Sequence, residues 1–259
     1  MRLDRALWRD LRTVLGSGVV RLYLLLQVVA AVVFVALRGE DTVSMVALTW
    51  LGLLVALVLA WWSGRHRLAQ PQPDPVPAAR PRSLFALLTA AGMTAWGFGW
   101  GAELTLLLVA AGVGGWIWAA LRTGSFRGLA ARLLRDPRPL LPLLLLLALP
   151  KLLAGGPIYL VGALVALPSG IGQELLYLLG LFAPLEAATR RPALAGVVAA
   201  LVFALIHVPL LLDINGGQVW AATANAVIFQ SGVGLVAVVA YRRHRAAVPI
   251  GVAHALAMG

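Results

Sequence analysis

The sequence predicts an all-α polytopic membrane protein, a transmembrane helical bundle of eight or nine spans with its N-terminus in the cytoplasm. Of its 259 residues, 61% are hydrophobic and only 12% are charged, whereas soluble domains are about 25% charged. Apolar stretches such as residues 43–62 and 192–212 hold about 20 residues each, the length that crosses a bilayer as a helix. Basic residues gather on alternate loops, which is typical of cytoplasmic loops in membrane proteins.

The elements follow in chain order. Residues 1–17 space leucines at i+4 with arginines between them, which predicts an amphipathic helix on the membrane surface; a disordered basic tail is the alternative. The chain then divides into a two-span section (18–69), a proline-rich cytoplasmic linker (70–82), further spanning helices (83–164) and a C-terminal core (165–259). The apolar segments are residues 18–37, 43–62, 83–101, 104–121, 139–154, 157–182, 192–212, 219–241 and 247–258.

Charge supports this layout and limits the partners. With a cytoplasmic N-terminus, 18 of the 21 basic residues fall on inside loops. The net charge of +11 is spread over membrane loops, so we expect anionic lipid headgroups as partners and no nucleic acid. The chain has no cysteine, which excludes disulfides, thiolate metal sites and a cysteine nucleophile.

Three ionisable side chains lie deep inside apolar stretches: Glu174, His207 and His254. A charge in a bilayer costs several kcal/mol, so such residues usually face a protein interior or a wet cavity. Counted at ~1.5 Å per residue from the cytoplasmic ends, Glu174 lies roughly 18 Å deep, His207 roughly 22 Å and His254 about 10 Å. One carboxylate and two imidazoles from three spans are the components of a metal site or an acid/base site.

The chemistry of these groups leaves alternatives open. Glu174 could act as a general base on water. His207 and His254 could ligate a zinc ion with Glu174, or could hydrogen-bond a developing oxyanion without any cofactor. Each histidine could also be structural, bonding a backbone carbonyl across a helix pair, and Glu174 could be protonated and structural. Asn225 is a candidate polar partner, although helix–helix bonding is its default role.

Residues 165–259 resemble the CPBP family of intramembrane metalloproteases, which includes the CAAX prenyl endopeptidases and bacteriocin-processing or abortive-infection (Abi) proteins. Phe203-x-x-x-His207 fits the second family motif, and Pro249-Ile250 ahead of His254-Ala255 looks like the third. The resemblance implies a multi-pass protein of a bacterial cytoplasmic membrane. It also implies a metalloendopeptidase that cleaves a membrane-associated peptide or protein, with Glu174 and the two histidines as its site residues.

The first family motif, E-E-x-x-x-R, is only partly present. Gln173 stands where the first Glu belongs and Glu174 where the second does, Tyr177 takes a usually aromatic position, and Leu178 replaces the Arg. A register one residue later puts Glu174 at the base but loses the second Glu and still lacks the Arg. Met258 replaces the Asn of the third motif. The alternative function is therefore a catalytically impaired relative that binds membrane peptides or acts as an accessory protein. A small-solute transporter is a third class, although the repeated halves typical of transporters are not seen.

Overall fold

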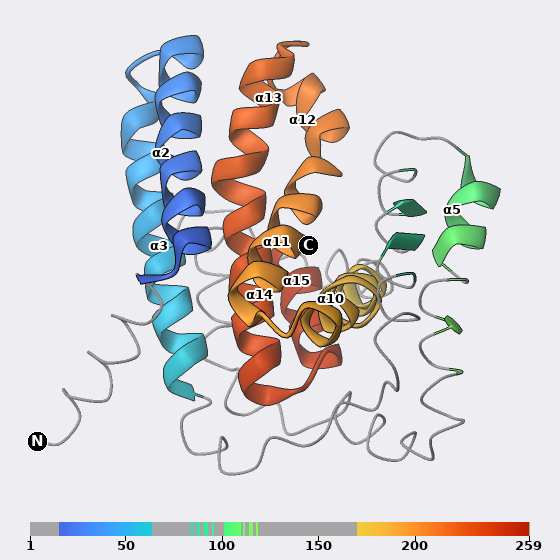
Figure 1. Ribbon diagram of the computed structural model, residues 1–259. Coiled ribbons are helices and arrows are strands. Elements are labelled where there is room, and N and C mark those ends of the chain that lie inside the picture. Colours follow the sequence, from blue (N-terminus) through green and yellow to red (C-terminus); the bar gives the residue numbers. More distant parts are fainter. Residues whose placement is uncertain are drawn as a thin grey trace, which may run out of the picture.

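The computed structural model describes residues 16–63, scattered residues between 84 and 118, and residues 170–258 (Figure 1). These parts of the chain form helices and contain no strand. The predicted surface helix, the proline-rich linker and the segment 139–154 lie outside the described residues, apart from residues 16 and 17. The elements are α2 (Gly18–Arg38), α3 (Thr42–Ser63), α5 (Ala102–Val109), the π-helix η4 (Leu175–Phe182), α10 (Ala183–Thr189), α11 (Pro192–Leu205), α12 (Val208–Ile214), α13 (Val219–Asn225), the π-helix η5 (Ala226–Gln230), α14 (Ser231–His244) and α15 (Val248–Met258).

The helical membrane architecture is confirmed in the described part of the chain. There, three stretches are long and apolar enough to cross a bilayer: Gly18–Arg38, Thr42–Leu59 and Val219–His244. The pair α11 and α12, bent by 46°, passes the same criterion as a fourth, broken span. These four coincide with the predicted segments 18–37, 43–62, 219–241 and 192–212. The predicted total of eight or nine also counts segments outside the described residues.

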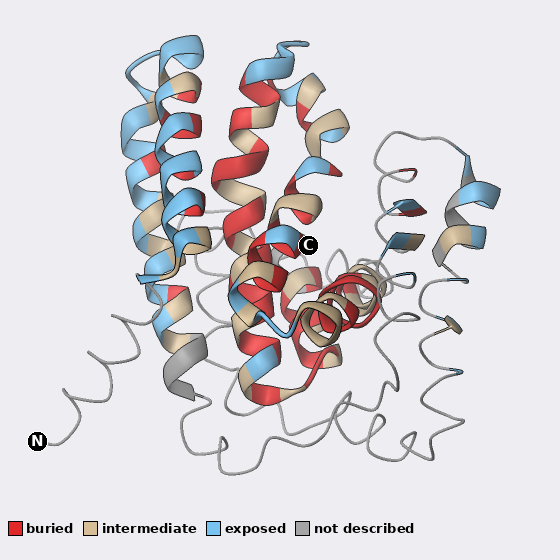
Figure 2. Ribbon diagram, viewed as in Figure 1, coloured by how far each residue is buried: buried red, intermediate tan, exposed pale blue. Residues whose placement is uncertain are grey.

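The pair α2 and α3 forms one outer wall of the bundle (Figure 2). Leu22 and Leu48 on this wall are 67% and 68% exposed. Such large apolar surfaces suit hydrocarbon rather than water, as expected for spans that face lipid. On its inner side α2 buries Phe34, which packs with Ile228 and neighbouring alanines. This inner face attaches the wall to α13 and η5.

The main core lies where η4, α11 and α14 meet. Tyr177, Phe182 and Phe203 are completely buried there, together with small residues such as Ala199 and Ala240. Alanine and glycine at these contacts let the backbones approach closely, the usual packing of membrane helices. The core therefore forms around the two segments that carry Glu174 and Phe203.

A buried polar network joins the N-terminal wall to this core. The Gln27 amide nitrogen lies 2.6 Å from the Val227 carbonyl and 2.8 Å from Ser231 Oγ. The hydroxyls of Tyr23 and Ser231 are 2.9 Å apart. Trp50 Nε1 donates to Gln27 Oε1 at 3.4 Å. Polar groups inside a bilayer must find partners within the protein, so these bonds fix α2 against α14.

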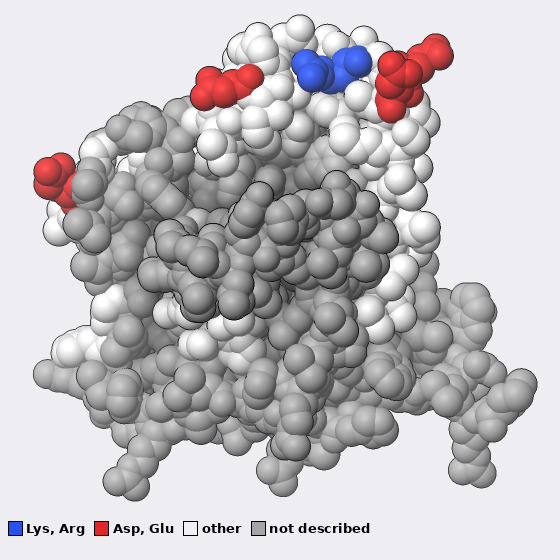
Figure 3. Space-filling model, turned by 180° about the vertical axis from the view of Figure 1, so that it is seen from behind, with Lys and Arg blue, Asp and Glu red and all other residues white. Residues whose placement is uncertain are grey.

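Charged residues of the described part are separated between the two ends of the bundle. At the end with the α2–α3 and α12–α13 turns lie Arg38 and the acidic residues Glu40, Asp41 and Asp213. Figure 3 shows acidic side chains on both sides of a basic patch along this rim. The opposite end, where α10 and α14 finish, carries the arginines Arg190, Arg191, Arg242, Arg243 and Arg245.

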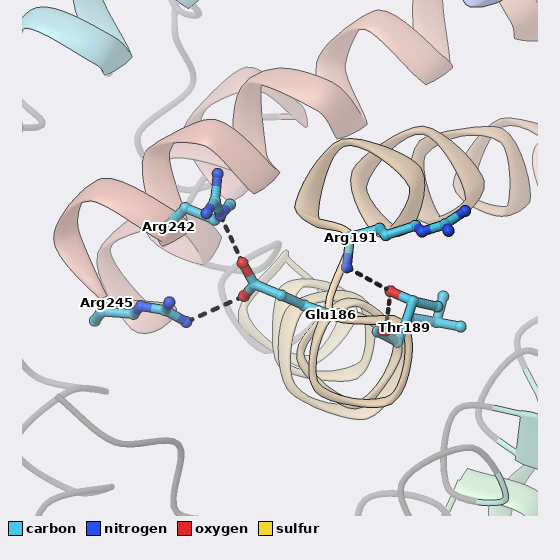
Figure 4. A network of polar contacts seen from close by, with 6 residues as sticks. Glu186, Thr189, Arg191, Arg242 and Arg245 are labelled. Carbon is cyan, nitrogen blue, oxygen red and sulfur yellow. Dashed lines mark hydrogen bonds and ion pairs between the residues drawn. The ribbon is translucent and has the colours of Figure 1, made fainter. Parts of the chain in front are cut away.

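Glu186 holds this arginine-rich end together (Figure 4). Its carboxylate accepts from Arg242 Nε at 2.7 Å and from an Arg245 guanidinium nitrogen at 3.5 Å. Thr189 Oγ1 caps the following turn by accepting from the Arg191 backbone N–H at 3.2 Å. The helical segment continues to Thr189, past the predicted boundary at residue 182. The Glu186 carboxylate can stay on this segment because Arg242 and Arg245 neutralise its charge.

Candidate functional site

Glu174 and His254 form a direct, buried contact. Nδ1 of His254 lies 3.0 Å from Oε1 of Glu174. The Glu174 side chain is 2% exposed and that of His254 is 14% exposed. Their residues are 80 positions apart in the chain, so tertiary packing alone creates the pair. When Glu174 is ionised it only accepts, so His254 donates from Nδ1 and keeps its Nε2 lone pair.

Two glycines explain why the pair can form. A Cβ atom on Gly170 would lie 2.7 Å from both the Ala255 nitrogen and the Gly251 oxygen. A Cβ atom on Gly251 would lie 2.5 Å from the Cα atom of Ile171. Such approaches are open only to glycine, so the backbones touch at this crossing. Glu174 is one turn after Gly170 and His254 is three residues after Gly251, which brings both side chains to the same crossing.

The segment with Glu174 is also strongly tilted. In Figure 1 the helical segment 170–189 is viewed almost down its axis, whereas α2 and α14 are viewed from the side. The depth count assumed helices perpendicular to the membrane, and so it put Glu174 well below His254. Tilt keeps Glu174 at a depth that the short α15 can reach.

His207 lies at a break between α11 and α12. The sequence pattern had predicted instead that it lies within one continuous helix. Pro209 has no backbone N–H and its ring clashes with the carbonyl four residues earlier, which ends α11 at Leu205. The His207 backbone N–H turns to the Ala204 carbonyl at 3.0 Å. This leaves the Phe203 carbonyl free, and Nδ1 of the His207 ring lies 2.6 Å from it. A carbonyl only accepts, so Nδ1 carries a proton and Nε2 holds the lone pair of the neutral ring.

The ring of Phe203 connects the site residues. Its centroid lies 4.7 Å from that of His207, 6.1 Å from that of His254 and 4.8 Å from that of Tyr177. Phe203 is fully buried, so it is a rigid centre for the groups around it. The structure therefore brings Glu174, His207 and His254 into one neighbourhood, with only the Glu174–His254 pair in hydrogen-bond contact.

The supporting residues of the sequence interpretation have different positions. Tyr177 and Phe203 belong to the site, and Gln173 is partly buried on the segment just before Glu174. Asn225 is partly buried at the junction of α13 and η5. Leu178 is completely buried in the apolar core, where the family motif would have an arginine.

Zinc ligation by Glu174, His207 and His254 stays a prediction. Among the residues that the structure describes, no three His, Cys, Asp or Glu side chains are grouped so that they could hold a metal ion. Glu174 Oε1 is already engaged with His254 Nδ1. In metal sites such a carboxylate normally orients a ligating histidine rather than sharing the ion with it.

Residues 155–258 match a family model described as type II CAAX prenyl endopeptidase Rce1-like. Over these residues the chain is similar to this family. No curated protein matches the chain, and no solved structure does. The Rce1-like region contains Glu174, His207 and His254 but not the helices α2 and α3. The match confirms the resemblance of this region to CAAX prenyl endopeptidases, and the apolar spans show an integral membrane protein.

Sequence reasoning missed the glycines that assemble the Rce1-like site. Gly170 and Gly251 make the crossing between residues 170–174 and α15, and Gly234 leaves room for the Tyr177 hydroxyl, which would lie 3.0 Å from a Cβ atom there. A signal was present, because a glycine precedes Glu174 by four residues and His254 by three. Small residues at helical spacing next to an intramembrane ionisable residue indicate a close helix crossing at that residue.

Proposed function

We propose that this protein is an intramembrane endopeptidase that cleaves a membrane-associated peptide or protein. The observation that carries the proposal is the buried Glu174–His254 pair, with His207 also beside the Phe203 ring. An intramembrane carboxylate paired with an imidazole is expensive to bury and is usually functional. The arginine-rich end of the bundle would face the cytoplasm, in keeping with the positive-inside rule.

Glu174 acts as the general base in this proposal. Its carboxylate takes a proton from a water molecule while the water oxygen bonds to the carbonyl carbon of the peptide. His254 donates from Nδ1 to Glu174 Oε1, which fixes the carboxylate and leaves Oε2 for the water. His207, when protonated at Nε2, donates to the developing oxyanion. Collapse of the tetrahedral intermediate passes the proton from Glu174 to the leaving nitrogen.

The assay that tests the proposal uses purified full-length protein in liposomes. A panel of fluorescent membrane-associated peptides, a prenylated CAAX peptide among them, is incubated with the wild type and with His207→Ala. We expect the wild type to cleave at least one peptide, and His207→Ala to lose about 10²-fold or more in kcat, since it lacks an oxyanion donor. Cleavage at an undiminished rate by a correctly folded His207→Ala protein would exclude this role.

A metal-independent reaction is the second expectation. Since Glu174 is bonded to His254 and no third ligand joins the histidines among the described residues, the proposed steps need only side chains and water. Dialysis against a strong chelator should leave the cleavage rate within about twofold of the untreated protein, because no step of the proposed reaction uses a metal ion. Loss of activity that added zinc restores would instead support zinc bound by the histidines.

A non-catalytic relative that binds membrane peptides through the same residues is the second candidate. It is favoured by Leu178, which is completely buried in the apolar core at the place where the family motif has an arginine. In that case the protein binds peptides from the same panel and cleaves none of them. Binding that survives in Glu174→Gln without any product in the wild type would decide for this candidate.

A further inference from the structure

Two buried polar atoms near the site have no hydrogen-bond partner among the residues that the structure describes. They are Oε2 of Glu174 and the hydroxyl oxygen of Tyr177. Tyr177 is completely buried, and the Glu174 side chain is 2% exposed. Buried polar groups are nearly always satisfied, and an exception calls for a bound water, an ion or a functional role. Two such exceptions three residues apart on one helical segment require a common explanation.

The Tyr177 hydroxyl is buried close to the α14 backbone at Gly234. The ring packs against Phe203 at 4.8 Å between centroids, and Tyr177 interacts electrostatically with Glu174. A Cβ atom on Gly234 would lie only 3.0 Å from the hydroxyl oxygen, so glycine at this position provides its space. The π-helix η4 begins directly after Glu174 and includes Tyr177, and π-helical segments often occur at functional sites.

We propose that Glu174 Oε2 and the Tyr177 hydroxyl together bind one water molecule, and that this is the water that attacks the substrate. The inference rests on the proposed function and adds Tyr177 to the groups that touch the reacting atoms. No other ligand class is needed, because one water satisfies both orphaned atoms at once.

The hydrogen bonds of this water are compatible with attack. The water donates one proton to the carboxylate oxygen and accepts the Tyr177 O–H through one lone pair. Its second lone pair stays free to bond to the peptide carbonyl carbon. Oε1 remains with His254, so each carboxylate oxygen has a separate task. The proton that Glu174 takes up is the one that the water already donates to it in the resting state.

Tyr177→Phe is the decisive variant. It keeps the ring that packs on Phe203 and removes only the hydroxyl. We expect kcat to fall roughly 10- to 100-fold with KM within about twofold, because a group that orients the nucleophile acts on the chemical step. Thermal stability in detergent should change little, since the variant loses only a hydrogen bond to one bound water. A wild-type kcat in Tyr177→Phe would overturn the inference.

Tyr23→Phe is the matched control. Tyr23 is also a buried tyrosine within a span, but its hydroxyl is bonded to Ser231 and Gln27. This variant should lose stability and keep kcat per folded molecule. If Tyr177→Phe and Tyr23→Phe lose the same factor in kcat, both hydroxyls affect the rate only through packing, and the inference fails.

Glu174→Gln separates this inference from the proposed function. If Glu174→Gln is inactive and Tyr177→Phe is fully active, only the role of Tyr177 is wrong. If Glu174→Gln is active as well, the proposed function itself fails. An experimental density map that resolves ordered waters gives a test without an assay: a water bonded to both atoms supports the inference, and a dry gap between them overturns it.

Discussion

We expect the replacement of Glu174 with glutamine to abolish cleavage and to leave the protein folded. The amide oxygen can still accept from His254 Nδ1, so the 3.0 Å contact at the helix crossing survives. The amide cannot take a proton from water, and loss of a general base lowers kcat by about 10²- to 10⁴-fold. The measurement is product formation from the peptide panel in liposomes, together with thermal unfolding to establish that the fold is kept.

Glu186→Gln is the matched control for this variant. Glu186 lies on the same continuous helical segment, but its carboxylate pairs with Arg242 and Arg245 at the arginine-rich end. Arg242 is 43% exposed in that pair, and pairs near water contribute little to stability. Activity should therefore be close to that of the wild type. A Glu174→Gln protein that keeps more than about a tenth of the wild-type rate would contradict the assignment of the base.

Replacing Gly170 with alanine disrupts the site without touching an ionisable residue. The added Cβ atom would lie 2.7 Å from two backbone atoms of α15, and backbone cannot rotate away as a side chain can. Overpacking of this kind costs about 1–3 kcal/mol of stability. The two helices must separate, and a shift of ~1 Å in a catalytic group can cost about 10²-fold in rate. We expect both losses in thermal unfolding and in the cleavage assay.

Gly172→Ala is the control, because it lies two residues further along the same helix. No atom lies within 4 Å of a Cβ built at Gly172, and alanine favours the helix by up to about 1 kcal/mol relative to glycine. This variant should be active and at least as stable as the wild type. If Gly170→Ala behaves like Gly172→Ala, the close crossing does not hold the site together.

The spans in the described residues could be predicted from sequence because the signal is local. A helix that faces lipid must be apolar over about 20 residues, and α2 and α3 show that run directly. The identity of the three ionisable residues was equally accessible, since a charged or titratable group stands out in such a run. The break at His207 had a signal as well, because Pro209 inside a helical pattern ends the helix just before it.

The arrangement of the site could not be read from these patterns. Contact between Glu174 and His254 depends on the tilt of residues 170–189 and on the approach of Gly170 to Gly251. Both depend on how distant segments pack, and hydrophobic periodicity carries no information about it. Tyr177 was expected only as a usually aromatic position, because its orphaned hydroxyl becomes visible only once its neighbours are in place.

The polar network around Gln27 has a consequence for biosynthesis. The ribosome makes α2 and α3 long before α14, and N-terminal parts of a chain fold first. Until Ser231 and the Val227 carbonyl arrive, the Gln27 amide has only Tyr23 and Trp50 of the same hairpin as partners and lacks the two contacts made by the later helix. The hairpin of α2 and α3 therefore keeps unused hydrogen-bonding capacity in the bilayer until α14 packs against it. This capacity favours the correct pairing of α14 with α2 during insertion.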